Sequence, residues 1–283
     1  MKCFYHSADL DGHCSGAIVK LKFPECEMIG INYGDTIDIN NINQDEEVFM
    51  VDFCLQPFDG MLELNKKAKL HWIDHHAKGS IDEAFQRGFL ASGGQLLEVG
   101  KAGCELTWQY LFHEKDIPEC IFLLGRYDVW DHKADINILP FQYGMRNNSD
   151  TRPTNIILWQ KLFQSSFEVH EIIKTGKTIL DYEMTQNIKF CKAYAFETEF
   201  NGLKAICANR GFTNSKLFDS VYNPLKHHLM ITFCRKKLPS KTWTVSLYST
   251  RNDVDCGEIA KSYGGGGHKG AAGFQCSEIP FEI

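Results

Sequence analysis

Acids and imidazoles follow three short apolar segments of the chain, and together they have the chemistry of a divalent-metal site. The first segment, Lys2–Tyr5, is followed by His6, Asp9 and Asp11. The second, Val48–Val51, is followed by Asp52, and the third, Leu70–Ile73, is followed by Asp74, His75 and His76. A carboxylate at the end of a buried strand needs a cation or hydrogen-bond donors, because desolvating an isolated charge is costly. Donor sets that mix carboxylates with imidazoles suit Mn²⁺ better than Ca²⁺, which takes oxygen ligands, or structural Zn²⁺, which often takes thiolates.

Each motif also has a structural alternative when it is taken alone. Asp9 and Asp11 are spaced i and i+2 in a segment expected to be an extended loop, and such D-x-D-G sequences are common in solvated turns. Asp52 could instead cap the helix expected after Pro57, and paired histidines also occur in wet clefts without a metal. The three motifs in this order on successive strand ends favour one shared metal site.

A site for two ions needs one more carboxylate than these motifs supply. Asp128 and Asp131 come at the end of the apolar segment that begins at Pro118. We expect Asp128, the first of them, to be the ligand, with Asp131 as the alternative. Two divalent ions about 3.5–4 Å apart can share a carboxylate and activate water for in-line attack on phosphorus. The four separated segments therefore predict a centre for phosphoester hydrolysis.

Strands and helices alternate in the part of the chain that must position these side chains. Strands are expected at Lys2–Tyr5, Met28–Tyr33, Val48–Phe53, Leu70–Ile73 and, at a sheet edge, Gly88–Ala91, and helices are expected at Ser15–Lys22, Phe58–Ala68, Cys104–Glu114, Pro118–Asp128 and Thr154–Phe163. Alternation with short links predicts an α/β fold with a mostly parallel sheet and helices on both faces.

The character of the sequence changes near Phe196. A long helix over Phe167–Ala193 is expected to connect residues 1–180, the predicted catalytic domain, to a smaller α/β domain at residues 195–283. The elements expected in that second domain are β-type segments at Leu203–Ala208, His227–Cys234 and Trp243–Tyr248 and a helix at Asp255–Tyr263.

A glycine run near the end of the sequence is the second motif with a chemical interpretation. Gly264–Gly267 precedes His268 and Lys269, and neither a regular strand nor a stable helix is expected there. Backbone without side chains lets an anion approach the N–H groups. The residues expected to bind substrate phosphate are Gly265, Gly266, Gly267 and His268. The run lacks the G-K-[ST] of a Walker loop, and its alternative is a flexible linker.

Basic residues elsewhere in the second domain offer fewer candidates. Arg251, together with Lys241 and Arg210, could line a groove for a phosphate backbone. The cluster Arg235–Lys237 is interpreted as part of a hairpin with a solvated turn at Pro239-Ser240.

Composition limits the classes of protein that this chain can represent. The 283 residues carry a formal net charge of −6, so a nucleic-acid partner must be held at a local site and not by a broadly basic face. The 11 cysteines include no C-x-x-C pair, which argues against a zinc ribbon and favours reduced thiols. Without a signal peptide or an 18-residue apolar segment, we expect a cytoplasmic protein with no membrane partner. A homodimer is left open.

These motifs resemble those of the DHH family of phosphoesterases. HSADLDG at His6–Gly12 is similar to the first family motif, Val51-Asp52 to the second, Asp74-His75-His76 to the third and RYDVWD at Arg126–Asp131 to the fourth. GGGGHKGAAGF at Gly264–Phe274 resembles the glycine-rich motif of the DHH-associated C-terminal domain of oligoribonuclease (nanoRNase) members and single-strand DNA exonucleases. The resemblance covers nearly the whole chain.

The resemblance implies two divalent metal ions, for which we expect Mn²⁺. The residues implied as ligands are His6, Asp9 and Asp52 for one ion and Asp11, Asp52, His75 and Asp128 for the other, with Asp52 bridging. His76 would contact the scissile phosphate, and Asp74 would orient a histidine. The sequence departs from the family pattern in two places. Tyr248 stands where many relatives have an arginine that contacts substrate, which leaves Arg251 as the substitute for that arginine. The fourth motif lacks the common D-[ST]-G form.

The implied activity is hydrolysis of very short oligonucleotides to 5′-mononucleotides. The expected substrate is a short single-stranded RNA (nanoRNA) or a linear dinucleotide such as pGpG or pApA. One alternative is a pyrophosphatase or exopolyphosphatase that uses the same metals. Another is a protein that binds nucleotides without cleaving them.

Overall fold

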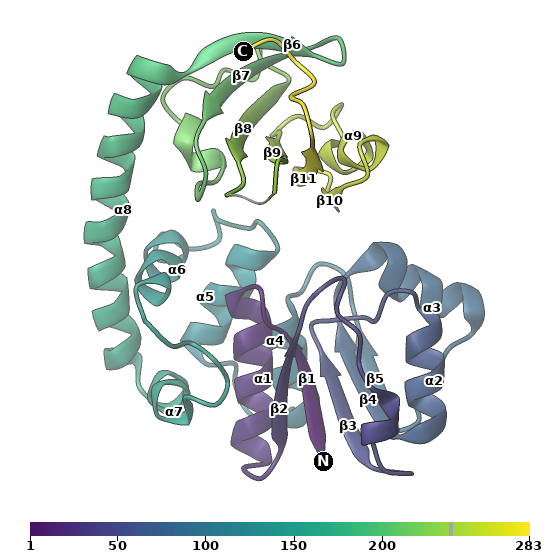
Figure 1. Cartoon of the computed structure of the whole chain (residues 1–283). Coiled ribbons are helices and arrows are strands. Elements are labelled where there is room, and N and C mark those ends of the chain that lie inside the picture. The colour runs from purple at the N-terminus through teal and green to yellow at the C-terminus, as the bar shows by residue number, and fades with distance from the viewer. Residues whose placement is uncertain (238–239) are drawn as a thin grey trace. The chain divides into compact units, whose positions relative to one another are not determined.

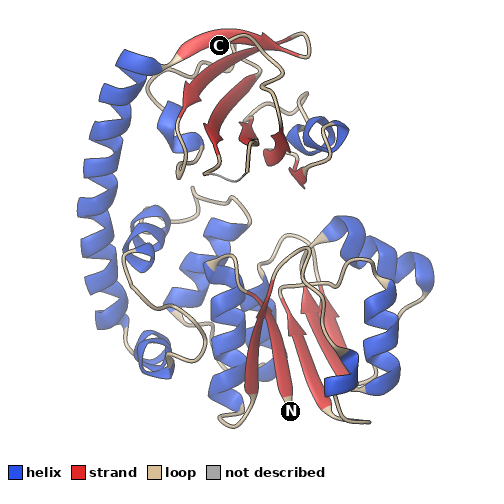
Figure 2. Ribbon diagram, viewed as in Figure 1, coloured by secondary structure: helices blue, strands red, loops and turns tan. Residues whose placement is uncertain are grey.

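Two compact units, Met1–Leu180 and Asp181–Ile283, make up the computed structural model of the chain (Figure 1). The structure describes residues 1–237 and 240–283, so Pro239 of the expected hairpin turn lies outside the described residues. The long helix α8 (Ser166–Tyr194) begins in the first unit and ends in the second. The predicted α/β class, with a parallel sheet first and a second sheet after a helical connection, is confirmed (Figure 2).

The first unit is built on a five-stranded parallel sheet in the order β2-β1-β3-β4-β5. Its strands are β1 (Lys2–His6), β2 (Glu27–Ile31), β3 (Glu47–Val51), β4 (Lys69–Asp74) and β5 (Gly94–Leu97). Tyr5 of β1 is opposite Gly30 of β2 on one side and Val51 of β3 on the other. The chain therefore builds outward in both directions from the β1–β3 pair. Ligands of open parallel sheets bind beyond the carboxyl ends of the strands at such a reversal.

Helices cover both faces of this sheet (Figure 1). The helices on one face are α1 (Leu10–Lys22) and α4 (Gly103–Leu111), and those on the other are α2 (Asp59–Lys67) and α3 (Asp82–Arg87). Side chains alternate between the faces, so Met50 packs with Met61 of α2, whereas Phe49 packs with Val19 of α1. A further helical layer, packed with α1 and α4, consists of α5 (Glu119–Asp128), α6 (Ile138–Arg146) and α7 (Ile156–Gln164).

The start of α1 and the edge strand of the sheet differ from the sequence prediction. Helix α1 begins at Leu10 and not at Ser15, because Asp9 caps it by accepting a hydrogen bond from the Gly12 N–H at 3.0 Å. Asp11 therefore lies in the first helical turn and not in an extended loop. The edge strand expected at Gly88–Ala91 is wrong, because Gly88 ends α3 in the left-handed conformation and the strand begins at Gly94.

The second unit contains a six-stranded mixed sheet in the order β10-β11-β9-β8-β7-β6. Its strands are β6 (Phe196–Phe200), β7 (Leu203–Asn209), β8 (Leu229–Arg235), β9 (Trp243–Tyr248), β10 (Gly266–His268) and β11 (Ala271–Cys276). Only the β7–β8 pair is parallel among the described strand pairs of this sheet. Helix α9 (Cys256–Ser262) packs on the sheet through Ala260, in one core with Leu247 and Phe274.

Three short helical turns complete the described elements. They are η1 (Ile39–Asn41), η2 (Ala77–Ile81) and η3 (Ser215–Phe218). None of the helices within residues 1–237 and 240–283 is both long enough and apolar enough to cross a membrane.

Candidate metal centre

Asp52 lies at the centre of the candidate site. It directly follows β3, the residue is 1% exposed, and its φ of 55° is in the left-handed region that few residues other than glycine adopt. Its backbone N–H donates to the carbonyl of Ile73 at 2.9 Å, which fixes it beside β4. The Asp52 carboxylate thereby lies at the ends of two neighbouring strands, at the reversal point of the sheet.

His6 and Asp9 lie on one side of this carboxylate. The Nδ1 atom of His6, the last residue of β1, is 3.2 Å from Oδ2 of Asp9 and 3.7 Å from Oδ2 of Asp52. Donor atoms of the three residues all lie within 4.8 Å of one another. One carboxylate of this group is held by the start of α1, since Asp9 is the N-cap.

His75 connects Asp52 to a second group of donors. Its Nε2 atom lies 3.1 Å from Oδ1 of Asp52, 3.4 Å from Oδ2 of Asp128 and 3.7 Å from Oδ2 of Asp11. Asp128 is the last residue of α5. Asp131, the sequence alternative to Asp128, instead lies 3.7 Å from an Arg126 guanidinium nitrogen and belongs to no donor group in the described residues.

The start of α4 holds Asp11 in place. Its carboxylate accepts hydrogen bonds from the backbone N–H groups of Gly103 and Cys104, both at 2.8 Å. The first N–H groups of a helix have no partner within the helix and carry partial positive charge, so they stabilise a carboxylate at that end. The sequence did not reveal this pairing, which joins residues about 90 positions apart.

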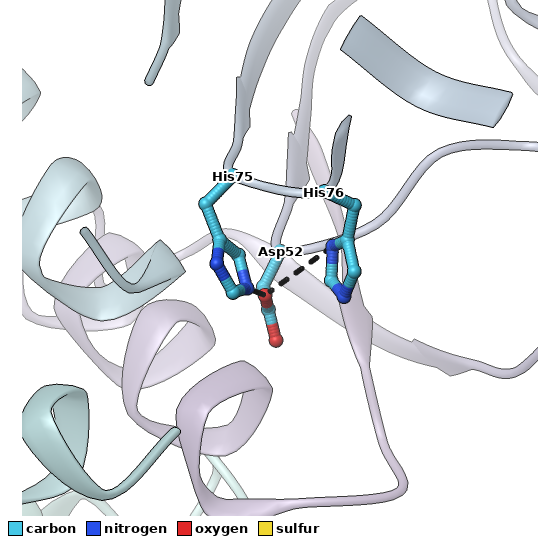
Figure 3. A group of neighbouring side chains, drawn as sticks. All are labelled: Asp52, His75 and His76. Carbon is cyan, nitrogen blue, oxygen red and sulfur yellow. Dashed lines mark ion pairs between the residues drawn. The ribbon is translucent and has the colours of Figure 1, made fainter. Parts of the chain in front are cut away.

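The imidazoles of His75 and His76 lie on either side of the Asp52 carboxylate (Figure 3). His76 Nδ1 is 4.0 Å from Asp52 Oδ1 but only 2.7 Å from Asp74 Oδ1. Asp74 is fully buried, accepts the backbone N–H of His75 at 2.8 Å, and accepts the Ser80 hydroxyl with its other oxygen. Asp74 therefore orients His76 and the backbone of this turn, and it belongs to none of the donor groups among the described residues.

Burial and mutual repulsion raise the pKa values of two carboxylates of the centre. Burial raises the pKa of Asp52 well above its ordinary value, and the charge of Asp11 raises it further. The same two causes raise the pKa of Asp128. Asp74 differs, because the hydrogen bonds and charge of His76 outweigh its burial and lower its pKa. The first two acids therefore need a cation to stay ionised at neutral pH.

The carboxylates in turn favour the charged form of two imidazoles. Burial lowers the pKa of His6, but Asp52 and Asp9 more than offset this effect and bring the pKa to about 10. Burial also lowers the pKa of His76, and Asp74 more than offsets it to give a pKa of about 9. Protons thus hold the place of cations in this cluster, and divalent ions would displace them.

Three buried atoms of the centre lack hydrogen-bond partners among the described residues: Nδ1 of His6, Oδ1 of Asp52 and Nε2 of His75. Buried polar atoms are nearly always satisfied in folded proteins, so these three atoms, which lie close to other donors of the centre, indicate a missing ligand. Carboxylate oxygens and imidazole nitrogens are donors for divalent metals of the Mn²⁺ type. These residues therefore fit metal ions.

The glycine run does not have the conformation expected from the sequence. Gly266–His268 forms a strand, β10, paired with β11. The N–H groups of Gly264 and Gly265 each donate at 2.9 Å to carbonyls at the end of α9, so the Gly265 N–H is not available to an anion. A side chain at Gly265 would collide with the carbonyl of Gly273, whereas Gly266 has no atom within 4 Å of its Cβ position. Close backbone packing explains part of this run.

Arg251 also has a structural partner. Its guanidinium pairs with the Asp253 carboxylate, with Nε 2.9 Å from Oδ1, and donates to the carbonyl of Pro224 at 2.7 Å. Tyr248, for which the resemblance implied an arginine, donates its hydroxyl to the carbonyl of Thr213 at 3.4 Å. The expected role of Arg251 as a substrate contact stays a prediction, and substrate would have to compete with Asp253.

Sequence reasoning missed a buried ion pair behind the centre. Glu105 accepts the backbone N–H of Ala102 at 2.9 Å and pairs with Arg126 of α5. The pair joins the start of α4, which holds Asp11, to the end of α5, which carries Asp128. Glu105 is the third residue of α4, a common position for a capping glutamate, and this was the available sequence signal.

Comparisons with known proteins place this geometry in a known fold. No protein-family model matches the chain. The uncharacterized protein R106 of Acanthamoeba polyphaga mimivirus is 25% identical over 310 residues, covering 98% of this chain and 69% of that protein. Among solved structures, the pGpG-specific phosphodiesterase PggH from Vibrio cholerae is similar over 97% of this chain and 92% of its own, with a TM-score of 0.58 and 13% identity.

A second solved structure is described as a DHH domain. It belongs to a member of a ribosomal protein family and is similar over 96% of this chain and 81% of its own, with a TM-score of 0.56 and 14% identity. The fold is that of a DHH phosphoesterase. An exopolyphosphatase-related protein from Bacteroides fragilis shares this DHH-type fold over 98% of this chain and 87% of its own, with a TM-score of 0.55 and 14% identity.

The three residues of the DHH motif have distinct positions in this fold. Asp74 is buried and bonded to the turn, His75 reaches the carboxylates of the centre, and His76 lies between Asp74 and Asp52. The DHH phosphoesterase fold predicted from the motifs is confirmed.

Proposed function

We propose that this protein is a metal-dependent phosphodiesterase that hydrolyses very short oligonucleotides, such as nanoRNA and linear dinucleotides, to 5′-mononucleotides. The observation that carries the proposal is the buried Asp52 carboxylate between two groups of metal-type donors. Among these donors, His6 Nδ1, Asp52 Oδ1 and His75 Nε2 have no hydrogen-bond partner in the described part of the chain. The similarity of the fold to a pGpG-specific phosphodiesterase supports a phosphodiester substrate.

Divalent ions, Mn²⁺ in our proposal, would be held in two positions around Asp52. The proposed ligands are His6, Asp9 and Asp52 for one ion and Asp11, Asp52, His75 and Asp128 for the other. When bound, such ions stabilise negative charge on phosphoryl oxygens and activate water at neutral pH. Asp11 and Asp128 would keep their positions through the start of α4 and the end of α5.

His76 is the proposed contact to the scissile phosphate. Asp74 accepts a hydrogen bond from its Nδ1 atom at 2.7 Å, which fixes the ring. Asp74 also favours the charged form of His76, in which Nε2 carries a proton and can donate a hydrogen bond to a phosphoryl or leaving oxygen as charge develops there. Asp74 is thus a positioning residue in this proposal. The phosphate contacts at Gly266, Gly267 and His268 stay predictions.

Two other functions use the same residues. The similarity to an exopolyphosphatase-related protein supports a pyrophosphatase or exopolyphosphatase as the second candidate. A protein that binds nucleotides without cleavage is the third, although the convergence of every predicted ligand favours catalysis. A homodimer stays a prediction, which light scattering of the purified protein would check.

A substrate panel tests the proposal. The purified protein is incubated with Mn²⁺ and 5′-phosphorylated RNA and DNA of 2 to 10 nucleotides, pGpG, pApA, pyrophosphate or polyphosphate, and products are separated by chromatography. We expect fastest turnover of dinucleotides and short RNA, with 5′-mononucleotides as products. Faster release of phosphate from pyrophosphate or polyphosphate would favour the second candidate. Tight dinucleotide binding without product would favour the third.

A further inference from the structure

Trp130 differs from the other tryptophans of the first unit. The residue is 54% exposed, whereas Trp72, Trp108 and Trp159 are 5% exposed or less. Its φ is 62°, in the left-handed region that bulky side chains rarely adopt. Such conformations concentrate at functional sites, and Asp52 at the candidate centre is another example in this chain.

A tight turn places Trp130 beside the centre. The Trp130 N–H donates to the carbonyl of Tyr127 at 3.1 Å, and the Asp131 N–H donates to that of Arg126 at 2.9 Å. Trp130 is two residues from Asp128, so their α-carbons are within about 7 Å, the span of two extended residues. Oδ2 of Asp128 is itself 3.4 Å from His75 Nε2.

Neighbouring rings support the indole from one side. Trp130 stacks on His132 with ring centroids 5.4 Å apart and 25° between the planes, and His132 stacks on Tyr127 at 4.9 Å and 19°. The Arg146 guanidinium lies 5.5 Å from the Tyr127 ring centroid and donates to its hydroxyl at 3.1 Å. The indole is therefore the exposed end of a preorganised stack.

We propose that the exposed face of Trp130 is the stacking surface for a nucleobase of the substrate. This inference rests on the proposed function, since a nucleotide whose phosphate is at the centre carries its base into this neighbourhood. A base gains favourable stacking on an aromatic ring whatever its identity, because every base has a π face. Inorganic pyrophosphate and polyphosphate have nothing to stack there, so Trp130 favours nucleotides over them.

Steady-state kinetics and binding test the role of Trp130. Wild type, Trp130→Phe and Trp130→Ala are compared for turnover of pGpG with Mn²⁺. Calorimetry then measures the Kd of a diguanylate analogue with a methylene group in place of the scissile bridging oxygen, which cannot be cleaved. We expect Trp130→Ala to raise KM and Kd about 5- to 150-fold, with a smaller effect on kcat, and Trp130→Phe to stay close to wild type.

A matched control and two outcomes separate this inference from the proposed function. Phe85 of α3 is also a highly exposed aromatic residue, at 76%, and Phe85→Ala should leave KM and Kd unchanged. If wild type turns over pGpG but Trp130→Ala matches it in KM and Kd, the stacking role is wrong. If wild type cleaves no dinucleotide yet the analogue binds with a Trp130-dependent Kd, the proposed function fails and the stacking surface stands.

Discussion

Gly103 lies so close to Asp52 that a Cβ atom on the glycine would be 2.6 Å from the Cβ atom of Asp52. The same glycine donates its backbone N–H to Asp11 at 2.8 Å. One residue at the start of α4 thus sets the positions of two acids of the centre. A methyl group would fit here only if the Asp52 side chain or the helix moved.

Gly103→Ala is expected to damage the centre although alanine is a better helix former than glycine. The clash should lower the free energy of unfolding by about 1–3 kcal/mol. Displacing Asp52 by a fraction of an ångström to 1 Å should lower turnover of the best substrate about 10²-fold. Urea unfolding in chelator and turnover with Mn²⁺ would measure the two effects.

Gly60→Ala is the matched control for that substitution. Gly60 is also helical, in α2, but its added Cβ would meet only the Leu55 side chain, at 3.2 Å or more. We expect turnover near wild type for this variant. Wild-type turnover in Gly103→Ala as well would show that the close approach to Asp52 is unimportant.

The two proposed ion positions predict different losses in variants of single ligands. Metal analysis after removal of free Mn²⁺ should give two ions per wild-type chain, about one in His6→Ala and Asp128→Ala, and none in Asp52→Ala. Thermal unfolding gives a second readout, because a ligand at 100 times its Kd stabilises the fold by about 2.7 kcal/mol. Asp52→Ala should lose this Mn²⁺-dependent stabilisation and lower turnover at least about 10²-fold.

Asp131→Ala is the matched control for Asp128→Ala. Asp131 lies three residues further along and faces Arg126, not the donor groups. The Asp131→Ala variant should retain both ions and most of the turnover. Two ions in Asp128→Ala and one in Asp131→Ala would assign the fourth acid to the wrong residue.

Asp74→Asn should separate positioning from metal binding. An amide cannot stabilise a charged His76 as the carboxylate does at 2.7 Å, so the ring loses its fixed orientation. We expect kcat to fall about 10- to 100-fold, the usual effect of removing such a supporting contact, while two ions stay bound. Ser80→Ala, which removes a donor from the other Asp74 oxygen, should have a smaller effect. Unchanged kcat in Asp74→Asn would refute the positioning role.

His71 should contribute to the acid sensitivity of the fold. It stacks on Phe49, its Nδ1 is 2.8 Å from the Tyr110 hydroxyl, and burial lowers its pKa although Glu47 opposes this. The folded state therefore binds fewer protons than the unfolded chain, whose histidines titrate near 6.5, so stability is lost as the pH falls below about 6.5.

The substitution His71→Gln should reduce this loss of folding stability at low pH. In chelator, the decrease in unfolding free energy between pH 7.5 and pH 5.5, measured with urea, should be smaller than in wild type. His113→Gln is the control, because the His113 side chain is 74% exposed. Identical pH profiles for His71→Gln and wild type would contradict the assignment.

Apolar periodicity predicted the parallel sheet because its strands are short buried segments such as VFMV, bounded by polar links. Helix α6 was missed because its sequence contains Pro140 and Gly144, which oppose helix formation locally. Its glycine lies against the Ile172 carbonyl of α8, and Gly176 of α8 lies against the Pro140 carbonyl. This close helix packing depends on tertiary contacts that local patterns do not contain.

The candidate ligands were identifiable because strand ends in a parallel sheet meet at one edge. The groups that hold these ligands in place could not be identified from the sequence. Asp11, for example, accepts hydrogen bonds from Gly103 and Cys104, which belong to a helix distant in sequence. The composition of the glycine run permits both anion binding and tight backbone packing, so the sequence alone does not decide between them. At Gly265 the structure shows packing.

The donors around Asp52 come from sequence positions that extend from His6 to Asp128. A ribosome therefore has to synthesise all of α5 before the last carboxylate exists, and the growing polypeptide cannot complete the set earlier. A fragment that ends before Asp128 would therefore lack a ligand of the second proposed ion position, although His6, Asp9 and Asp52 of the first position would be present.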